Sequence, residues 1–178
     1  RQGDVTGSAV LVTMDGKRAL VGEVQALANS TDMHNPRRAV SGLDGARVAM
    51  ILAVLQARLK MSALGKAEVY ASTVGGMRVT EPAADLAIAM AVASVQEEKP
   101  IPFHTVVIGE VGLAGEVRPV SALGRRVAEA KRLGFRHAVI PAARADREDL
   151  PDGIRITRVT NLGEAVNACL FDGPPATF

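Results

Sequence analysis

Two carboxylates, Glu81 and Asp85, are the residues best placed for acid–base chemistry, because both would lie in the first turn of one helix. The same placement complements the positive end of the helix dipole, worth roughly 0.3–1 kcal/mol, and we favour this structural role. Nucleophilic catalysis has less support, since neither Ser94 nor Ser121 lies in a Gly-x-Ser-x-Gly or Ser-x-x-Lys motif. The sequence therefore offers paired carboxylates but no recognisable nucleophile.

A glycine-rich segment at residues 109–115 has the composition of a phosphate-binding loop. It lacks the Gly-Lys-Ser/Thr ending of such loops, and no helix is expected directly after it. Small residues are also what a tight hairpin needs, so we favour a turn at residues 113–116. This segment therefore predicts no ATP site in the chain.

Cysteine and histidine usage argues against metal and disulfide chemistry. Cys169 is the only cysteine, which excludes an intrachain disulfide and a four-thiolate zinc site. The three histidines are far apart, with no His-Glu-x-x-His spacing. We therefore expect no metal site and no cofactor in this chain, and the lack of disulfides favours a cytoplasmic location. We also expect no membrane contact, since no apolar run approaches the roughly 18 residues of a spanning helix.

Length and composition indicate one globular domain over residues 1–178. Apolar residues make up 48% and aromatic residues only 3%, so the core must be aliphatic and little material remains for stacking bases. Because Arg1 is not a start methionine, we expect a piece of a longer protein, with residues 1–6 as a linker remnant and residues 172–178 as a flexible tail.

Arginines form the clearest charged pattern, although the net charge is only +2. Arg47 is expected in the first turn of a helix, where the dipole disfavours a cation. Its partner is then either an acid such as Asp44 or a phosphate. Contacts to phosphates give sequence-independent, salt-sensitive DNA binding. The arginines that we consider for DNA contact are Arg37, Arg38, Arg47, Arg118, Arg125 and Arg126. The structural alternative is an ordinary solvated basic face.

Hydrophobic patterning predicts alternating strands and helices. Asp15-Gly16 between two apolar runs predicts a hairpin, and the polar residues 28–43 suggest a loop. Asp44, Thr80 and Asn161 are candidate helix N-caps. Strands are expected at residues 9–12, 19–24, 69–73, 105–109, 138–141 and 154–159, and helices at 43–61, 80–96, 121–133 and 161–170. This order predicts an α+β or α/β domain with helices packed on a mixed sheet.

Residues 78–86 and 109–119 resemble the catalytic segments of Lon-type peptidase domains. Those domains carry a serine nucleophile in a Pro-Ser-Ala-Gly turn and a lysine base on the helix after a glycine-rich hairpin. The matching positions here are Ala83 and Arg126. Alanine has no hydroxyl, and an arginine guanidinium is always charged in proteins. We therefore expect no catalytic residues at this degenerate dyad.

The chain from about Gly7 to Leu170 resembles the C-terminal Lon-like domain of the bacterial RadA (Sms) family. The matching blocks are residues 36–38, 41–44 with Arg47, 74–76, 80–87, 109–120, 133–135 and 138–141. Magnesium-chelatase-like proteins have a related segment, but their blocks look less similar. RadA-type domains share the losses at Ala83 and Arg126. The resemblance implies an α+β, Lon-protease-like fold (similar to ribosomal S5 domain 2), with helices packed on a mixed sheet.

The RadA family implies a hexameric ring ATPase that acts as a DNA motor in recombinational repair and branch migration. ATP, Mg and a zinc finger are implied only for domains upstream of the Lon-like part, and the RecA recombinase is an implied partner of the whole protein. For this chain the resemblance implies a non-catalytic scaffold that binds DNA. Two alternatives stay open: an oligomerisation collar whose arginines pair across subunits with acids such as Glu110 or Glu116, and an active serine peptidase.

Overall fold

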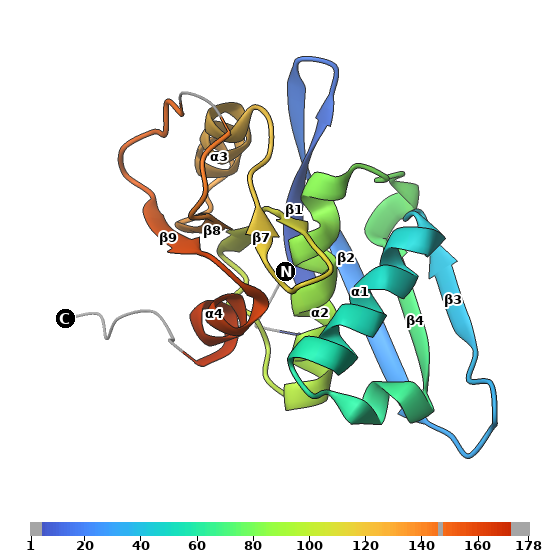
Figure 1. Cartoon of the computed structure of the whole chain (residues 1–178). Helices are drawn as coiled ribbons and strands as arrows, with labels where there is room; N and C mark the ends of the chain where they lie inside the picture. Colours follow the sequence, from blue (N-terminus) through green and yellow to red (C-terminus); the bar gives the residue numbers. More distant parts are fainter. Residues whose placement is uncertain (1–4, 146–147, 172–178) are drawn as a thin grey trace.

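A seven-stranded mixed sheet, in the order β3-β4-β2-β1-β5-β8-β9, organises the computed structural model, which describes residues 5–145 and 148–171 (Figure 1). The strands are β1 (Ser8–Asp15), β2 (Arg18–Ser30), β3 (Arg38–Ser41), β4 (Ala67–Thr73), β5 (Thr105–Val107), β8 (His137–Pro141) and β9 (Arg155–Val159), with a separate pair β6 (Glu110–Val111) and β7 (Val117–Arg118). The helices are α1 (Gly45–Arg58), α2 (Asp85–Glu97), α3 (Leu123–Arg132) and α4 (Leu162–Val166), which continues into a π-helical turn at Asn167–Phe171.

The predicted α+β fold with helices on a mixed sheet is confirmed. Strands β1 and β2 form the expected antiparallel hairpin, in which Asp15 pairs with Arg18. Gly16 in its turn has a φ of 60°, a conformation that glycine adopts without strain. The β1–β5, β5–β8 and β8–β9 pairs are parallel, and parallel neighbours need crossover connections. The β5–β8 connection contains α3, whereas the described residues between β8 and β9 contain no helix.

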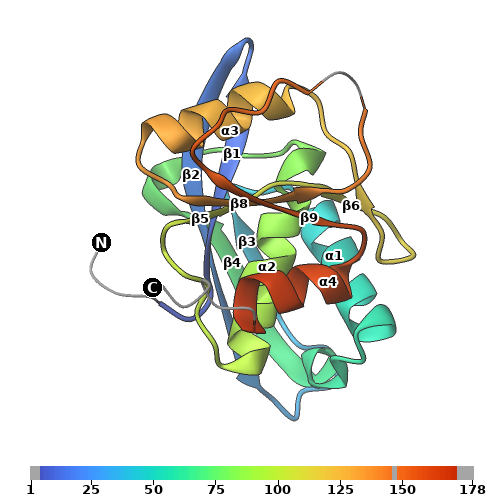
Figure 2. The ribbon, with the colours of Figure 1, turned by 90° about the vertical axis from the view of Figure 1, so that its left-hand side faces the viewer.

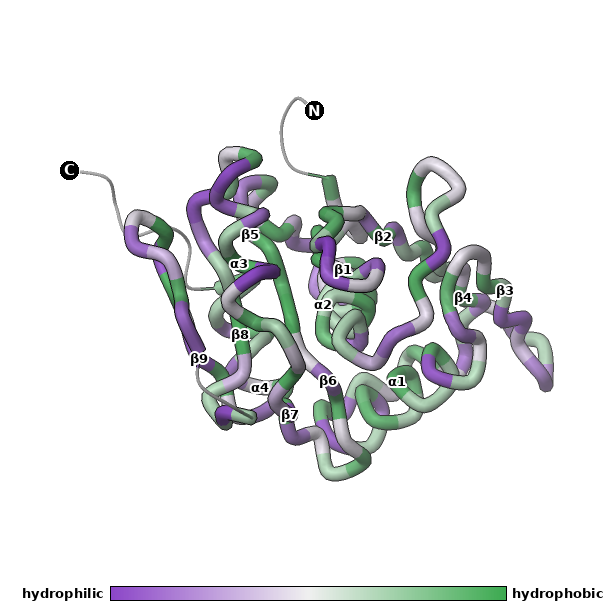
Figure 3. Tube along the Cα trace, turned by 90° about the horizontal axis from the view of Figure 1, so that it is seen from above, coloured by the Kyte–Doolittle hydropathy of each residue, from purple (hydrophilic) through white to green (hydrophobic). Residues whose placement is uncertain are grey.

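Helices cover both faces of the central sheet (Figure 2). Neighbouring residues of β5 point to opposite faces: Val107 joins the cluster packed under α1, α2 and α4, whereas Val106 joins the cluster under α3. In α2, residues 85–94 are all buried, as expected for a helix that is apolar nearly all round. Figure 3 shows that hydropathy differs between the strands: β5 and β8 are hydrophobic, whereas the edge strand β9 is hydrophilic.

Local expectations for the chain between β2 and α2 need two corrections. Residues 28–43, expected as a loop, contain the end of β2 and the short strand β3. A four-residue edge strand with polar ends carries too little pattern to be recognised without its partner β4. Thr80 is not a helix N-cap, because a 3-10 turn at Pro82–Ala84 precedes α2. Asp44 and Asn161 do cap α1 and α4, each through a side-chain oxygen.

The expected linker remnant and tail are only partly described, since residues 1–4 and 172–178 lie outside the described residues. Within the described part of the chain, no helix combines the length and the hydropathy needed to cross a membrane.

His137 gives the domain a pH-dependent stability. It is buried at the start of β8, with Nε2 2.7 Å from Oγ1 of Thr157. Burial, together with the charges of Arg155 and His104, lowers its pKa from 6.5 to about 4. Since the unfolded chain takes up this proton at higher pH, we expect this contribution to be complete above about pH 6.5. It should decline as the pH falls towards 4, by at most about 3 kcal/mol.

Urea unfolding between pH 7 and pH 5 measures this slope. The His137→Gln variant should show a flatter profile over the same range, because glutamine does not titrate. An unchanged slope in that variant would assign the pH dependence to other groups.

Candidate functional site

The start of α2 is held against the segment before β6 by a pair of backbone hydrogen bonds. The Gly109 amide donates to the Ala83 carbonyl at 3.0 Å, and the Leu86 amide donates to the Gly109 carbonyl at 3.0 Å. A Cβ atom on Gly109 would lie 2.9 Å from a methyl group of Val117 and 3.2 Å from Leu86, so only glycine fits here. The two segments singled out in the sequence therefore meet at one place in the fold.

The degenerate dyad position at Ala83 is a buried methyl group in the 3-10 turn. Its counterpart Arg126 is also buried, with a side chain only 1% exposed. The Arg126 guanidinium donates through Nη1 to the Val12 carbonyl at 2.9 Å and through Nε to the Ser121 carbonyl at 2.8 Å. It thus acts as a fixed donor, which is the opposite of what a general base must do.

Glu81 supplies the counter-charge for Arg126. Its two carboxylate oxygens accept from Nη1 and Nη2 at 2.5 and 3.2 Å. The same carboxylate accepts from the Thr13 hydroxyl at 2.9 Å and from the Met14 amide at 3.0 Å. Burial opposes ionisation of Glu81, but the hydrogen bonds and charge of Arg126 outweigh it, so the pKa of Glu81 is lowered. The pair joins α3, β1 and the start of α2.

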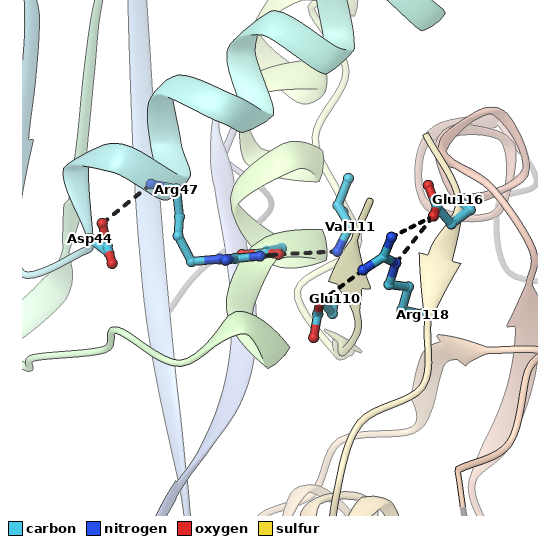
Figure 4. A network of polar contacts seen from close by, with 7 residues as sticks. Asp44, Arg47, Glu110, Val111, Glu116 and Arg118 are labelled. Atoms are coloured by element: carbon cyan, nitrogen blue, oxygen red, sulfur yellow. Dashed lines mark hydrogen bonds and ion pairs between the residues drawn. The ribbon is translucent and has the colours of Figure 1, made fainter. Parts of the chain in front are cut away.

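Asp85 makes a second arginine pair at the same helix start, with Arg47, which is labelled in Figure 4. Its side chain is fully buried, and its oxygens accept from Nε and Nη2 of Arg47 at 2.8 and 2.5 Å. It also accepts from the Val111 amide at 3.1 Å. The hydrogen bond to Asp85 raises the pKa of Arg47. The pair connects the first turn of α1 to α2 and β6.

Arg47 therefore has the internal partner that its position suggested, but the partner is Asp85. Asp44 instead caps α1, accepting from the Ala46 amide at 2.9 Å and the Arg47 amide at 3.3 Å. The carboxylates Glu81 and Asp85 do not form an acid–base pair, because each is committed to its own arginine. An arginine placed against the helix dipole was the one sequence signal for this arrangement.

The six arginines considered for DNA contact do not form one surface. Arg126 is buried, and Arg47, with 27% of its side chain exposed, is held by Asp85. Arg118 pairs with Glu110 and Glu116 of its own chain (Figure 4). A DNA contact through Arg126 is thus wrong for this structure, since a phosphate cannot reach a side chain enclosed by protein.

The remaining three arginines divide between the two ends of the molecule. Arg37 and Arg38 lie at the start of β3, near the bottom of Figure 1, where Arg38 donates to the carbonyls of Leu64 and Ala67. Arg125 lies on α3 beside the projecting tip of the β1–β2 hairpin at the top, and its Nη1 donates to the Lys17 carbonyl at 3.3 Å.

The arrangement at the tip adds two residues to the basic set. Lys17 and Arg18 follow directly after the Gly16 turn, and Arg18 is close enough to Glu129 of α3 to contribute to the lowering of its pKa. We call Lys17, Arg18 and Arg125 the hairpin-tip cluster. The Lys-Arg dipeptide in a predicted turn was visible in the sequence, but its proximity to α3 was not.

Comparison with known proteins gives two kinds of similarity. The family model for subunit ChlI of magnesium chelatase matches residues 75–144, which include the start of α2 and the glycine-rich hairpin. Curated relatives named DNA repair protein RadA match nearly the whole chain. The relative from Mycolicibacterium smegmatis is 50% identical over 162 residues, which cover 91% of this chain and 34% of the relative.

Relatives with lower identity carry the same name. The protein from Streptococcus pyogenes serotype M1 is 42% identical over 92% of this chain and 36% of its own length. The Escherichia coli K12 protein is 42% identical over 94% of this chain and 35% of its own length. The chain thus spans about a third of the length of the curated relatives that it matches.

Proposed function

We infer from these similarities, which support membership of the RadA family of DNA repair proteins, that the chain is a non-catalytic, Lon-like domain of such a protein. Its role is to serve as a scaffold and to contact DNA during recombinational repair and branch migration. The parent protein is a ring-forming ATPase. ATP, Mg, the zinc finger and any contact with the RecA recombinase belong to that parent protein, outside this chain.

The observation that carries the non-catalytic assignment is the pairing of Arg126 with Glu81. A Ser–Lys mechanism needs a hydroxyl and a base that can lose its proton. The structure has a methyl group at Ala83 and, at Arg126, a buried cation whose three nitrogens all donate hydrogen bonds. The same geometry makes Arg126 a structural residue of the scaffold.

Restoring the hydroxyl should not restore a peptidase. We expect the purified chain and its Ala83→Ser variant to show no turnover of an unfolded protein substrate. Adding Arg126→Lys should not change this, because Glu81 would hold the lysine ammonium in its charged form. Turnover by the unmodified chain would instead establish the serine peptidase alternative.

DNA contact is assigned to the hairpin-tip cluster. Lys17 and Arg18 lie on a projecting turn, and Arg125 lies beside them on the exposed face of α3. Three cations on a convex projection can each approach a phosphate without burying other groups. Arg37 lies at the opposite end of the sheet and is a separate candidate for DNA contact. A DNA segment bound at the tip does not reach it.

Removing charges from the cluster should weaken duplex binding in a measurable way. For the Lys17→Gln/Arg125→Gln variant, we expect the slope of log affinity against log salt to fall by about 1.8, or about 0.9 for each lost phosphate contact. Fluorescence anisotropy of a labelled duplex across a salt series gives the slope.

The matched control is Arg37→Gln, which removes one charge from the opposite end of the sheet. It should leave the slope unchanged if DNA binds at the tip. A reduced slope in this control, with no change in the tip variant, would move the DNA contact to the start of β3.

An oligomerisation collar is the second candidate, and one surface favours it. Leu27 of β2 and Ala39 of β3 flank Tyr70 of β4 in register on a sheet face that carries a shallow depression of about 530 Å³. Leu27 is 55% exposed there. Arg118 pairs with its acids inside one chain, however, which argues against these acids serving as intersubunit partners. A ring-sized mass without DNA binding in the same buffer would favour the collar.

A further inference from the structure

The phenylalanines of the described chain lie at the surface and not in the core. Phe103 is 49% exposed and Phe171 is 47% exposed, while Phe135 is half-buried. Large exposed apolar side chains gathered in one place point to an interaction site. The exposed Phe103 and Leu133 meet such a condition, because both line one surface pocket of about 300 Å³. His104 and Phe135 line the same pocket, and Phe135 also packs against the core cluster beneath α3.

The sheet itself brings these residues together. Phe103 and His104 precede β5, Phe135 precedes β8, and the two strands are parallel neighbours, so their amino ends lie side by side. The Arg136 amide donates to the His104 carbonyl at 3.0 Å, which ties the two approaches to each other. The rings of Phe103 and His104 are 5.7 Å apart between centroids, with their planes 40° apart.

Two arginines lie near this pocket along the backbone. Arg136 follows Phe135 directly, and the Arg155 amide donates to the Arg136 carbonyl at 2.9 Å. Both arginines are exposed. Within residues 5–145 and 148–171, neither guanidinium has an ion-pair partner.

One carboxylate also lines the pocket. Glu23 of β2 accepts from the Ser8 hydroxyl and from the Gln25 amide group at 3.2 Å, which fixes its position. A carboxylate beside aromatic rings is an acceptor for the exocyclic amino group of a base such as cytosine. The pocket thus combines a stacking surface, a hydrogen-bond acceptor and flanking cations.

We propose that this pocket binds an unpaired nucleobase of single-stranded DNA, stacked on Phe103, with the adjoining phosphates on Arg136 and Arg155. Aromatic rings with neighbouring cations are the common elements of single-strand binding surfaces. The proposal rests on the proposed DNA contact and adds a strand type to it, because a paired base inside a duplex cannot stack on Phe103. It also places single-stranded DNA away from the hairpin-tip cluster.

A single tryptophan reports on the pocket directly. The chain contains no tryptophan, so a Phe103→Trp variant has one indole, at the proposed stacking position. We expect oligodeoxycytidylate to quench its fluorescence. The matched control is Phe171→Trp, at a position of similar exposure at the end of the π-helical turn, where no quenching is expected.

Affinity gives the second readout. Phe103→Ala should weaken binding of the same oligonucleotide by between about 5-fold and about 150-fold, the range measured for loss of one base–aromatic stack. Binding of a duplex to this variant should stay unchanged. Arg136→Gln should lower the salt slope for the single strand alone.

The outcomes separate this proposal from the proposed DNA contact at the tip. Duplex binding without fluorescence quenching in the Phe103→Trp variant, and without an effect of Phe103→Ala, would overturn the pocket assignment and leave the tip contact standing. Quenching by the oligonucleotide without duplex binding would support the pocket assignment and overturn the proposed DNA contact at the tip. Quenching by an apolar peptide but not by the oligonucleotide would also overturn the assignment and make the pocket a protein-binding site.

Discussion

Replacing Glu81 with alanine is expected to lower the free energy of unfolding by about 3–5 kcal/mol, the cost of leaving a buried charge without its partner. Arg126 has 1% of its side chain exposed, so its charge cannot turn into water. Its other acceptors are the carbonyls of Val12 and Ser121, which carry no net charge. The change also leaves the Thr13 hydroxyl and the Met14 amide without their acceptor. Urea unfolding at pH 7 measures the loss.

An exposed arginine pair provides the matched control. Glu129 accepts from Arg132 at 2.9 and 2.7 Å, but 68% of the Arg132 side chain is exposed. Glu129→Ala should therefore change the free energy of unfolding little, because solvent screens an exposed ion pair. Equal losses in the two variants would show that Arg126 is better solvated than the structure indicates.

Removing both charges together tests the cause of the loss. The Glu81→Gln/Arg126→Met variant keeps an acceptor for Thr13 and Met14 and fills the arginine site with an apolar chain. It should recover most of the stability lost in Glu81→Ala, because no uncompensated charge remains. Failure to recover would mean that the arginine contributes through its carbonyl contacts and not through its charge.

The sequence predicted the elements that are locally determined. The β1–β2 hairpin follows from Asp15-Gly16, and the start of α1 follows from Asp44, since both signals act over a few residues. The strand β3 was not predicted, because it forms only by pairing with β4, which begins 26 residues after β3 ends. Short edge strands are defined by their neighbours more than by their own residues.

The candidate site divides in the same way. That Ala83 and Arg126 are unsuited to Ser–Lys catalysis is a prediction from residue type alone, because a missing hydroxyl can be recognised without a structure. What Arg126 does instead was not predictable, since Glu81 and Arg126 are 45 residues apart and meet only when α3 packs on the sheet. The same applies to Arg47 and Asp85, which are 38 residues apart. Several arginines selected for DNA contact are thus paired with carboxylates of the same chain.

The role of an arginine in this domain therefore depends on whether its side chain is buried or exposed. The arginines selected from the sequence include three kinds of residue. Arg47 and Arg126 pair with carboxylates at the start of α2, and Arg118 is exposed but pairs with Glu110 and Glu116. The others are exposed at the ends of the sheet. Only the exposed arginines can produce salt-dependent DNA binding. Loss of DNA binding after mutation of Arg47 or Arg126 would therefore report unfolding, so stability has to be measured alongside affinity.

The second arginine pair should carry a similar share of the stability. Asp85→Ala removes the acceptor of the Val111 amide and the partner of Arg47, and we expect it to lower the free energy of unfolding by about 3 kcal/mol. The loss should be smaller than for Glu81→Ala, because Arg47 is 27% exposed and can turn towards water. Asp85→Asn should fall between the unmodified chain and Asp85→Ala, since its amide oxygen can still accept from Val111.

A double-mutant cycle separates the ion pair from the backbone contact. We expect Arg47→Leu, Asp85→Asn and their combination to give a coupling energy of about 1–3 kcal/mol, because residues in one hydrogen-bonded pair are not additive. Asp44→Ala, which removes the cap from the same helix without touching Asp85, should be additive with Asp85→Asn. A coupling energy near zero between Arg47 and Asp85 would mean that Asp85 acts through Val111 alone. In that case α1 would be held to α2 by its apolar face, and Arg47 would again be available for DNA.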